Sequence, residues 1–222
     1  GLMFLMNDEI DRPVRIWEEM FLPDILEQQV LELLYVDSLG KEQKMVSDHI
    51  ILHKPDRAPV PTEVPLHWPF ALLLGILIGG LGFLFSYLSS KNIKNWAGTM
   101  TGAYFALIGM FLGLPGTILF LMSTLTEHTV TYFNENLFYA NPLYLVLIYF
   151  GIALAYGKIK RIKSIYKFWI VQIVLTLIAL FSKVLPIMNQ DNGLVLALLL
   201  PIIVLSAFSA YLLQKRSGNS IN

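Results

Sequence analysis

Five long apolar stretches with almost no charged side chain constrain the fold of this 222-residue chain more than any other feature. Each can supply the roughly 20 apolar residues that an α-helix needs to cross about 30 Å of hydrocarbon. Only one stretch contains a charged residue, Lys183, close to its end. The predicted membrane-spanning helices cover about residues 68–88, 99–123, 137–157, 168–187 and 193–213.

The overall composition supports this prediction. Hydrophobic residues make up 55% of the chain and charged residues 14%, whereas soluble globular proteins carry roughly 25% charged residues. Residues 1–66 hold 19 of the 32 charged residues, so the remainder cannot cover its surface with polar groups and needs lipid as its solvent. We therefore expect an all-α integral membrane protein with five transmembrane helices. The chain has no cysteine, which excludes disulfides, thiolate metal sites and a cysteine nucleophile within it.

The distribution of charge between the loops predicts the orientation in the membrane. The loop after the first span has two lysines, residues 157–167 contain five basic residues, and neither loop has an acidic one. The opposite loops hold three acidic residues, and residues 1–66 carry 13 acidic and 6 basic ones. Because basic residues in short loops face the cytoplasm, we expect the N-terminal segment outside and the C-terminus in the cytoplasm.

Small residues within the spans predict close helix packing. They recur at four-residue spacing, in the pairs Gly75 and Gly79, Gly98 and Gly102, and Gly109 and Gly113. This spacing lets two helices approach closely, and ordinary packing within the bundle is favoured over a specific dimer motif. The centres of the spans carry no acid, arginine or histidine, which argues against an ion pump or a proton-coupled transporter.

We expect four parts along the chain. The predicted parts are the end of an extracytoplasmic domain at 1–54, a proline-rich spacer at 55–66, the five-helix domain at 67–216 and a cytoplasmic tail at 217–222. The spacer should be semi-rigid, since polyproline-type segments extend by about 3 Å per residue. The chain begins with Gly1, and we expect it to be a fragment or a processed piece whose upstream part is missing.

The first part contains short elements rather than a complete domain. Residues 23–34 predict an amphipathic helix, because Pro23 is favoured at a first helical position and apolar residues recur at helical spacing. Residues 37–40 predict a turn, and residues 44–53 predict a strand. An apolar cluster precedes the helix and includes Trp17, Phe21 and Leu22. So short a segment cannot bury this cluster, which predicts contact with a partner domain.

The loop between the second and third predicted spans is rich in polar residues. Its candidate functional residues are His128, Thr131, Asn134, Asn136, Asn141 and Pro142. A histidine can exchange a proton near neutral pH, and an asparagine can orient a carbonyl or hold a turn. The favoured interpretation is that these groups cap helix ends and stabilise the loop. Contact with a substrate or a lipid head group is the second interpretation, and a metal site is disfavoured because too few ligands are present.

Two parts of the sequence resemble the Lnb-type lipoprotein N-acyltransferase family. In the first part, Asp11-Arg12-Pro13 and residues 20–24 before the amphipathic helix resemble the end of that family's extracytoplasmic domain, of the DUF4105-like type. Residues 127–137 and Asn141-Pro142 resemble the loop of its five-helix membrane domain. The order of the parts, the spacer and the number of spans agree as well, so the resemblance covers essentially the whole chain.

The resemblance implies a bacterial inner-membrane enzyme that moves an acyl chain from a lipoprotein's diacylglyceryl group to its N-terminal cysteine amine. In that family the catalytic cysteine and histidine belong to the extracytoplasmic domain. This chain has no cysteine, so no catalytic residue is carried over and the chain by itself is expected to be inactive. His128, Asn134 and Asn136 match the pattern of the membrane loop. The implied partners are membrane lipid, lipoprotein substrates and an upstream catalytic domain, without cofactor, metal or nucleic acid.

Two other functions remain open from the sequence. The chain could be a non-enzymatic membrane anchor or complex subunit that docks a partner protein, which the apolar cluster around Trp17 favours. A carrier of small solutes is disfavoured, because the predicted spans lack charged residues at their centres. Copurification of the chain with a separate catalytic subunit would favour the non-enzymatic subunit over the acyltransferase.

Overall fold

The computed structural model describes residues 2–6, 23–51, 67–89, 96–185, 188 and 190–218. The chain divides into two compact units, one formed by residues 1–11 and 66–222 and the other by residues 12–65. The division predicted from the sequence placed the first residues with the N-terminal segment, whereas the structure places them on the helical unit. The apolar cluster of Trp17, Phe21 and Leu22 lies outside the described residues, as does the predicted spacer.

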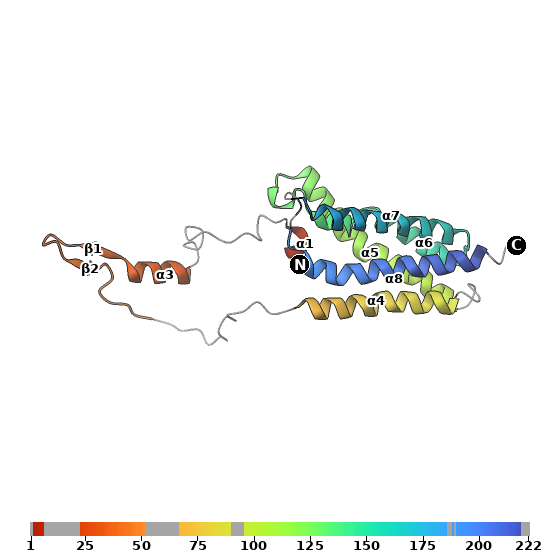
Figure 1. The fold of residues 1–222 in the computed structure, drawn as a ribbon, viewed down its shortest axis with the longest axis horizontal. Helices are drawn as coiled ribbons and strands as arrows, with labels where there is room; N and C mark the ends of the chain where they lie inside the picture. Colours follow the sequence, from red (N-terminus) through yellow and green to blue (C-terminus); the bar gives the residue numbers. More distant parts are fainter. Residues whose placement is uncertain are drawn as a thin grey trace. The chain divides into compact units, whose positions relative to one another are not determined.

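The larger unit is a bundle of helices that lie lengthwise beside one another (Figure 1). Its elements are α1 (Leu2–Leu5), α4 (Trp68–Ser89), α5 (Trp96–Leu125), η2 (Thr129–Thr131), η3 (Glu135–Phe138), α6 (Tyr144–Ala155), α7 (Arg161–Ser182) and α8 (Gly193–Gly218). Helix α4 packs mainly on α8, and α5 packs mainly on α6. The short helix α1 lies at the end of the bundle where α8 begins (Figure 1).

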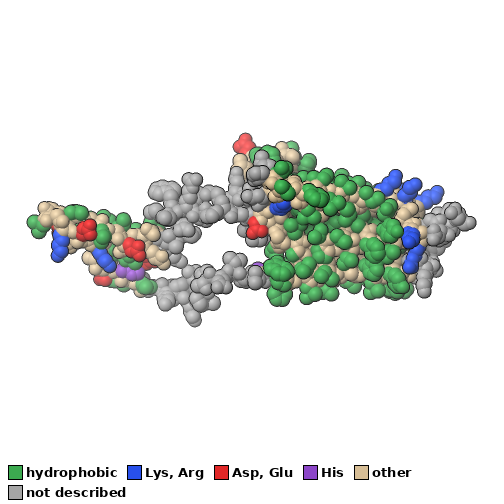
Figure 2. Space-filling view, viewed as in Figure 1, with side chains coloured by type: hydrophobic (Ala, Val, Ile, Leu, Met, Phe, Trp, Pro, Cys, Tyr) green, Lys and Arg blue, Asp and Glu red, His purple; other side chains and the backbone are tan. Residues whose placement is uncertain are grey.

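Four of the described helices, α4, α5, α7 and α8, are long and apolar enough to cross a membrane. Most of the large side chains that they expose are apolar, among them Phe70 at 74% exposed, Phe111 at 64% and Phe181 at 74%. Figure 2 shows apolar side chains along the length of the bundle, with a group of Lys and Arg side chains at one end. Since a water-soluble protein rarely exposes an apolar surface of this extent, the chain is a multi-pass membrane protein.

The third predicted span is longer than the helix that forms there. Helix α6 has 12 residues, which corresponds to about 18 Å at 1.5 Å per residue. Before it, the Asn141 side-chain oxygen accepts a hydrogen bond from the Leu143 N–H at 3.1 Å, and this local turn displaces the start of the helix. After it, Gly157 adopts a φ of 76°, which ends the helix. The prediction of a continuous span over 137–157 was therefore wrong in its bounds.

The fourth predicted span was placed too late in the sequence. Helix α7 begins at Arg161 and ends at Ser182, because Ile162, Ile165 and Trp169 form one buried face at helical spacing. The basic residues of this segment occupy the other faces of the same helix, so the basic loop and the span are continuous. The predicted start at residue 168 left the basic turns before it out of the helix.

Glycines let the paired helices approach to backbone contact. A Cβ atom at Gly75 would overlap the carbonyl oxygen of Leu198 on α8, and one at Gly102 would overlap the backbone nitrogen of Ala155. Gly116 is similarly tight against the backbone of Asn141. These contacts confirm the interpretation of the glycine pairs as packing positions within the bundle.

The smaller unit, described over residues 23–51, contains α3 (Pro23–Glu32) and a two-stranded hairpin of β1 (Leu34–Val36) and β2 (Glu42–Lys44). The helix prediction was confirmed to within two residues. The predicted strand at 44–53 was wrong, because the antiparallel register pairs Leu34 with Lys44, and residues 45–51 form no strand. The predicted turn is present, with Gly40 at a φ of 76° and its N–H bonded to the Asp37 carbonyl.

Candidate functional site

A buried ion pair lies at the end of the bundle that carries the polar loop. Glu135, in η3, has a side chain that is only 2% exposed, and its Oε2 lies 2.5 Å from Nζ of Lys183 beyond the end of α7. The pair joins two segments 48 positions apart in the sequence. A carboxylate buried to this degree requires a counter-charge and hydrogen bonds, because removing an ion from water costs several kcal/mol.

N–H groups of the loop before α8 donate further hydrogen bonds to the Glu135 carboxylate. The Gln190 N–H donates to Oε1 at 2.9 Å and the Asn192 Nδ2 donates to Oε2 at 3.3 Å. In return, Gln190 Oε1 accepts a hydrogen bond from the Glu135 N–H at 2.9 Å. Lys183 also donates to the carbonyl of Gln190 at 2.5 Å. One hydrogen-bonded cluster therefore holds the loop before α6 against the connection between α7 and α8.

The same cluster binds the backbone of the first residues of the chain. Nδ2 of Asn134 and Nδ2 of Asn136 both donate to the carbonyl oxygen of Phe4, at 3.2 Å and 3.1 Å. Gln190 Nε2 donates to the carbonyl of Met6 at 2.6 Å. Asn134 and Asn136 are 2% and 0% exposed, so their amides point into a space without bulk water. The polar loop thus recognises peptide carbonyls with neutral donors.

The orientation of the two asparagines is fixed by the local backbone. Asn134 is the N-cap of η3, and its Oδ1 accepts a hydrogen bond from the Asn136 N–H at 2.9 Å. This bond uses the oxygen of Asn134 and directs its NH2 group toward Phe4. The capping role that the sequence favoured is therefore present at Asn134, and the same geometry positions its NH2 group as a donor.

Asn141 makes a separate contact deeper in the bundle. Its Nδ2 donates to Oε1 of Gln172 on α7 at 3.1 Å, and both residues are buried. Its oxygen holds the turn before α6, as described above. Pro142, next to it, is half-buried. Asn141 and Pro142 consequently shape the start of α6.

The remaining candidates do not join the cluster. His128 is exposed and is the N-cap of η2, without a side-chain capping bond. Thr131 is buried, and its hydroxyl donates to the His128 carbonyl at 2.8 Å. These two residues stabilise the turn that carries η2, and the structure separates the His128 imidazole from the buried amides. Among the described residues, no group of His, Asp and Glu could hold a metal ion.

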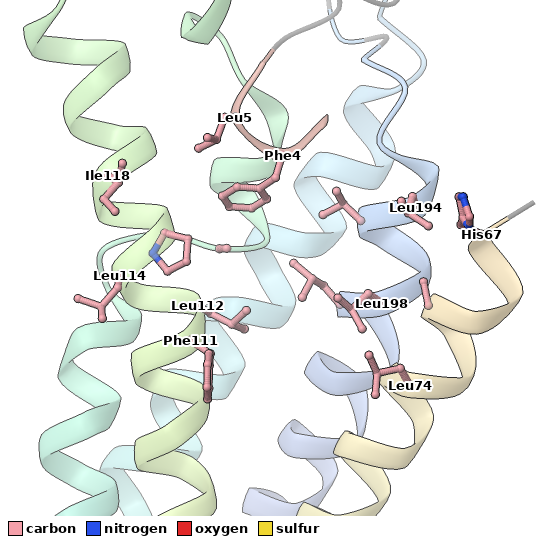
Figure 3. A pocket seen from close by; sticks show the side chains of 15 residues that line it. Phe4, Leu5, His67, Leu74, Phe111, Leu112, Leu114, Ile118, Leu194 and Leu198 are labelled. Carbon is pink, nitrogen blue, oxygen red and sulfur yellow. The ribbon is translucent and has the colours of Figure 1, made fainter. Parts of the chain in front are cut away.

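An apolar cavity of about 710 Å³ is lined by Phe4, the residue whose carbonyl the two amides bind. Its walls come from α4, α5 and α8, and Phe4 and Leu5 of α1 close its upper end. In Figure 3 the Phe4 ring points down between α5, with Phe111 and Leu112, and α8, with Leu194 and Leu198. This size is typical of a small-molecule or lipid site. Two neutral amide donors and an apolar cavity therefore adjoin each other at Phe4.

Several residues of this site were not recognised in the sequence. Glu135, Gln190 and Asn192 were treated as loop residues, and Lys183 as the end of a span. One partial signal points to the ion pair, since Lys183 is the only basic residue at the borders of these two loops, which hold three acidic residues. Nothing in the sequence pattern indicates that Phe4 would lie beside Asn134, because 130 positions separate them.

Comparison with known proteins identifies one family. The family model of the Lnb transmembrane domain matches residues 66–217, which include all the membrane helices and the polar loop. No curated protein and no solved structure matches the chain.

Proposed function

Because the chain belongs to the Lnb transmembrane-domain family, we propose that it forms the membrane part of a bacterial lipoprotein N-acyltransferase. The proposed reaction breaks an acyl ester of the lipoprotein's diacylglyceryl group and forms an amide with its N-terminal cysteine amine. The amine loses a proton and the released glycerol oxygen gains one. The observation that carries the proposal is the apolar cavity next to buried amides, within a bundle of this family.

The proposed topology has five crossings in the bacterial inner membrane. Helix α6 would cross together with the η3 segment before it, since its 12 residues are too short alone. The basic end, with Lys215 and Arg216, would face the cytoplasm. The end with Glu135 and the cavity would then face the extracytoplasmic side, where lipoproteins receive their acyl chains.

The chain's role in this proposal is to hold and orient lipid rather than to supply the nucleophile. Binding two substrates in one membrane plane replaces a bimolecular encounter by an oriented one, which lowers the entropic part of the barrier. We assign the buried loop amides to substrate contact and His128, Thr131 and Pro142 to the structure of the loop. Trp17, Phe21 and Leu22 are proposed to contact a catalytic domain.

The test compares the state of lipoprotein N-termini in cells with and without this gene. Deletion of the gene should leave lipoproteins with a free cysteine amine, which reacts with an amine-specific reagent and is identified by mass spectrometry of the N-terminal lipopeptide. Restoring the gene should remove the reactive amine. Lipoproteins that stay N-acylated after deletion would refute the proposed activity.

A second function is favoured by one observation. The small unit exposes apolar side chains, including Leu26 at 42%, Leu33 at 48% and Val36 at 64%, which suits an anchor that docks a partner protein. If the chain is such a subunit, deletion should leave N-acylation intact, and crosslinking at Leu33 should capture a separate protein.

A further inference from the structure

We propose that the cavity and the amides of Asn134 and Asn136 form one binding site for an acyl ester, which α1 occupies in this structure. The acyl chain would enter the cavity where the Phe4 ring lies, and the ester carbonyl would take the place of the Phe4 carbonyl. The inference rests on the proposed function for the source of the ester, a lipoprotein diacylglyceryl group, and on the contacts below for the site itself.

The polar half of the site matches an ester in charge and geometry. Two neutral amide donors converge on a single carbonyl oxygen, at 3.2 Å and 3.1 Å. An ester carbonyl is an acceptor of the same kind. The nearby charges of Glu135 and Lys183 compensate each other at 2.5 Å. An anionic phosphate prefers arginine, lysine or several N–H donors, so the cluster favours a neutral carbonyl over a phosphate.

The apolar half continues directly from these donors. Phe4 provides both the bound carbonyl and the ring that enters the cavity, so one residue already spans the two halves (Figure 3). Apart from His67, the cavity wall is formed by apolar side chains, with Leu112 and Pro115 on α5 and Leu198 and Leu199 on α8. Burying apolar chain here is favourable by about 25 cal/mol for each Å² removed from water.

The cavity has a route from the lipid phase. Three residues of its wall, Leu74, Phe111 and Ile118, are themselves 50%, 64% and 54% exposed. They belong to α4 and α5, which lie on the two sides of the cavity. The close backbone contacts within the bundle lie elsewhere, between α4 and α8 and between α5 and α6. A chain could therefore enter from the bilayer between α4 and α5 without separating either tightly packed pair.

Because α1 occupies the site, an acyl ester must compete with it for binding. The carbonyl of Phe4 and an ester carbonyl cannot bind the same two amides at once, and the Phe4 ring takes space that an acyl chain needs. Ester binding would therefore displace residues 4–6, whose remaining bond in the cluster is from Gln190 to the Met6 carbonyl. Shortening the Phe4 side chain should favour the lipid, since it removes part of the competing contact.

The experiment uses the protein from its native gene in nanodiscs with a photoreactive lipid. The probe is a diacylglyceryl-cysteine peptide with a diazirine in one acyl chain, and labelled residues are mapped by mass spectrometry. Labels should concentrate on Phe111, Leu114 and Leu198. A matched probe with ether in place of ester linkages lacks the carbonyl, and its labelling of these residues should fall about tenfold because two hydrogen bonds are lost.

Two tryptophan substitutions on α4 distinguish an effect of filling the cavity from a general effect on the protein. Ala71→Trp places a large side chain in the cavity from α4, and Leu81→Trp places one on the lipid-exposed face of the same helix. Ala71→Trp should abolish labelling and Leu81→Trp should leave it unchanged, while Phe4→Ala should increase it. If Ala71→Trp does not fold, the comparison of ester and ether probes on the unmodified protein decides the question.

The outcomes distinguish this inference from the proposed function. Ester-dependent labelling in the cavity without any N-acylation of the peptide would support the site and refute the acyltransferase. N-acylation with labels spread evenly over the outer faces of the helices would refute the site and leave the activity intact. Competition by unlabelled diacylglyceryl peptide but not by phosphatidylglycerol is expected, and the reverse would overturn the lipoprotein as the source of the ester.

Discussion

Glu135 Oε2 lies 2.5 Å from Lys183 Nζ, and this contact connects the loop before α6 to the end of α7. Both partners also bind Gln190, so the loop before α6 and the connection between α7 and α8 converge on the carboxylate. The ion pair holds the loop from which Asn134 and Asn136 extend toward Phe4. Its integrity therefore determines the geometry of the amides above the cavity.

Glu135→Ala should destabilise the folded bundle by about 3 kcal/mol, because it leaves Lys183 partly buried without its counter-charge. Unfolding of the purified protein in mixed micelles measures the change. Glu127→Ala is the matched control, since Glu127 is exposed in the same loop, and it should change stability by less than about 0.5 kcal/mol. Equal effects of the two substitutions would argue against a structural ion pair.

Gly102→Ala should reduce the yield of folded protein, because the added Cβ would overlap the backbone of Ala155 and force α5 away from α6. Gly80→Ala on α4 provides the control, as a Cβ there would have no neighbour within 4 Å among the described residues. The control should be neutral or stabilising by up to about 1 kcal/mol through helix propensity. Monodisperse protein recovered from the membrane fraction is the measurement.

Asn136→Ala should lower lipoprotein N-acylation with little loss of protein in the membrane, since the substitution removes a donor to the substrate carbonyl under our proposal. His128→Ala should leave both quantities close to those of the unmodified protein, because the imidazole is exposed and outside the cluster. N-terminal lipopeptides and immunoblots of the membrane fraction are measured together. Loss of acylation in His128→Ala alone would reverse the assignment of roles in this loop.

Single cysteines introduced into the 222-residue chain, which contains none, can test the proposed orientation. Glu127→Cys and Lys158→Cys place a thiol at exposed positions of opposite ends of the bundle. A membrane-impermeant maleimide added to intact spheroplasts should label the first and not the second, and permeabilisation should allow both. Labelling of Lys158→Cys in intact spheroplasts would invert the topology.

The helical architecture was predictable because it follows from local composition. Runs without charge locate α4, α5 and α8 within a few residues, and glycines at four-residue spacing identified packing positions such as Gly75, which the structure places against Leu198. The predicted start of helix α7 was too late, because its first turns carry basic residues on the exposed face and apolar residues on the buried face. A count of charges alone does not reveal such a buried face. Helix α6 was misjudged because the side chain of Asn141 redirects the backbone.

The candidate site was predictable only in part. The polar loop and its asparagines were found by composition, and the capping role of Asn134 follows from its position before η3. The partners of these residues are long-range, since Gln190 binds Glu135 across 55 positions and Phe4 meets Asn136 across 132. Such pairings depend on the assembled bundle and leave no periodic pattern in the sequence.

Reconstitution of the protein from its native gene, in liposomes with a synthetic diacylglyceryl-cysteine peptide, tests the central claim most directly. Transfer of an acyl chain within the peptide leaves its mass unchanged, while the cysteine amine becomes an amide and one ester is lost. We predict a product of unchanged mass that no longer reacts with an amine-specific reagent, and that forms much more slowly with Asn136→Ala. A peptide that keeps both esters and its reactive amine in the presence of the folded protein would contradict the account.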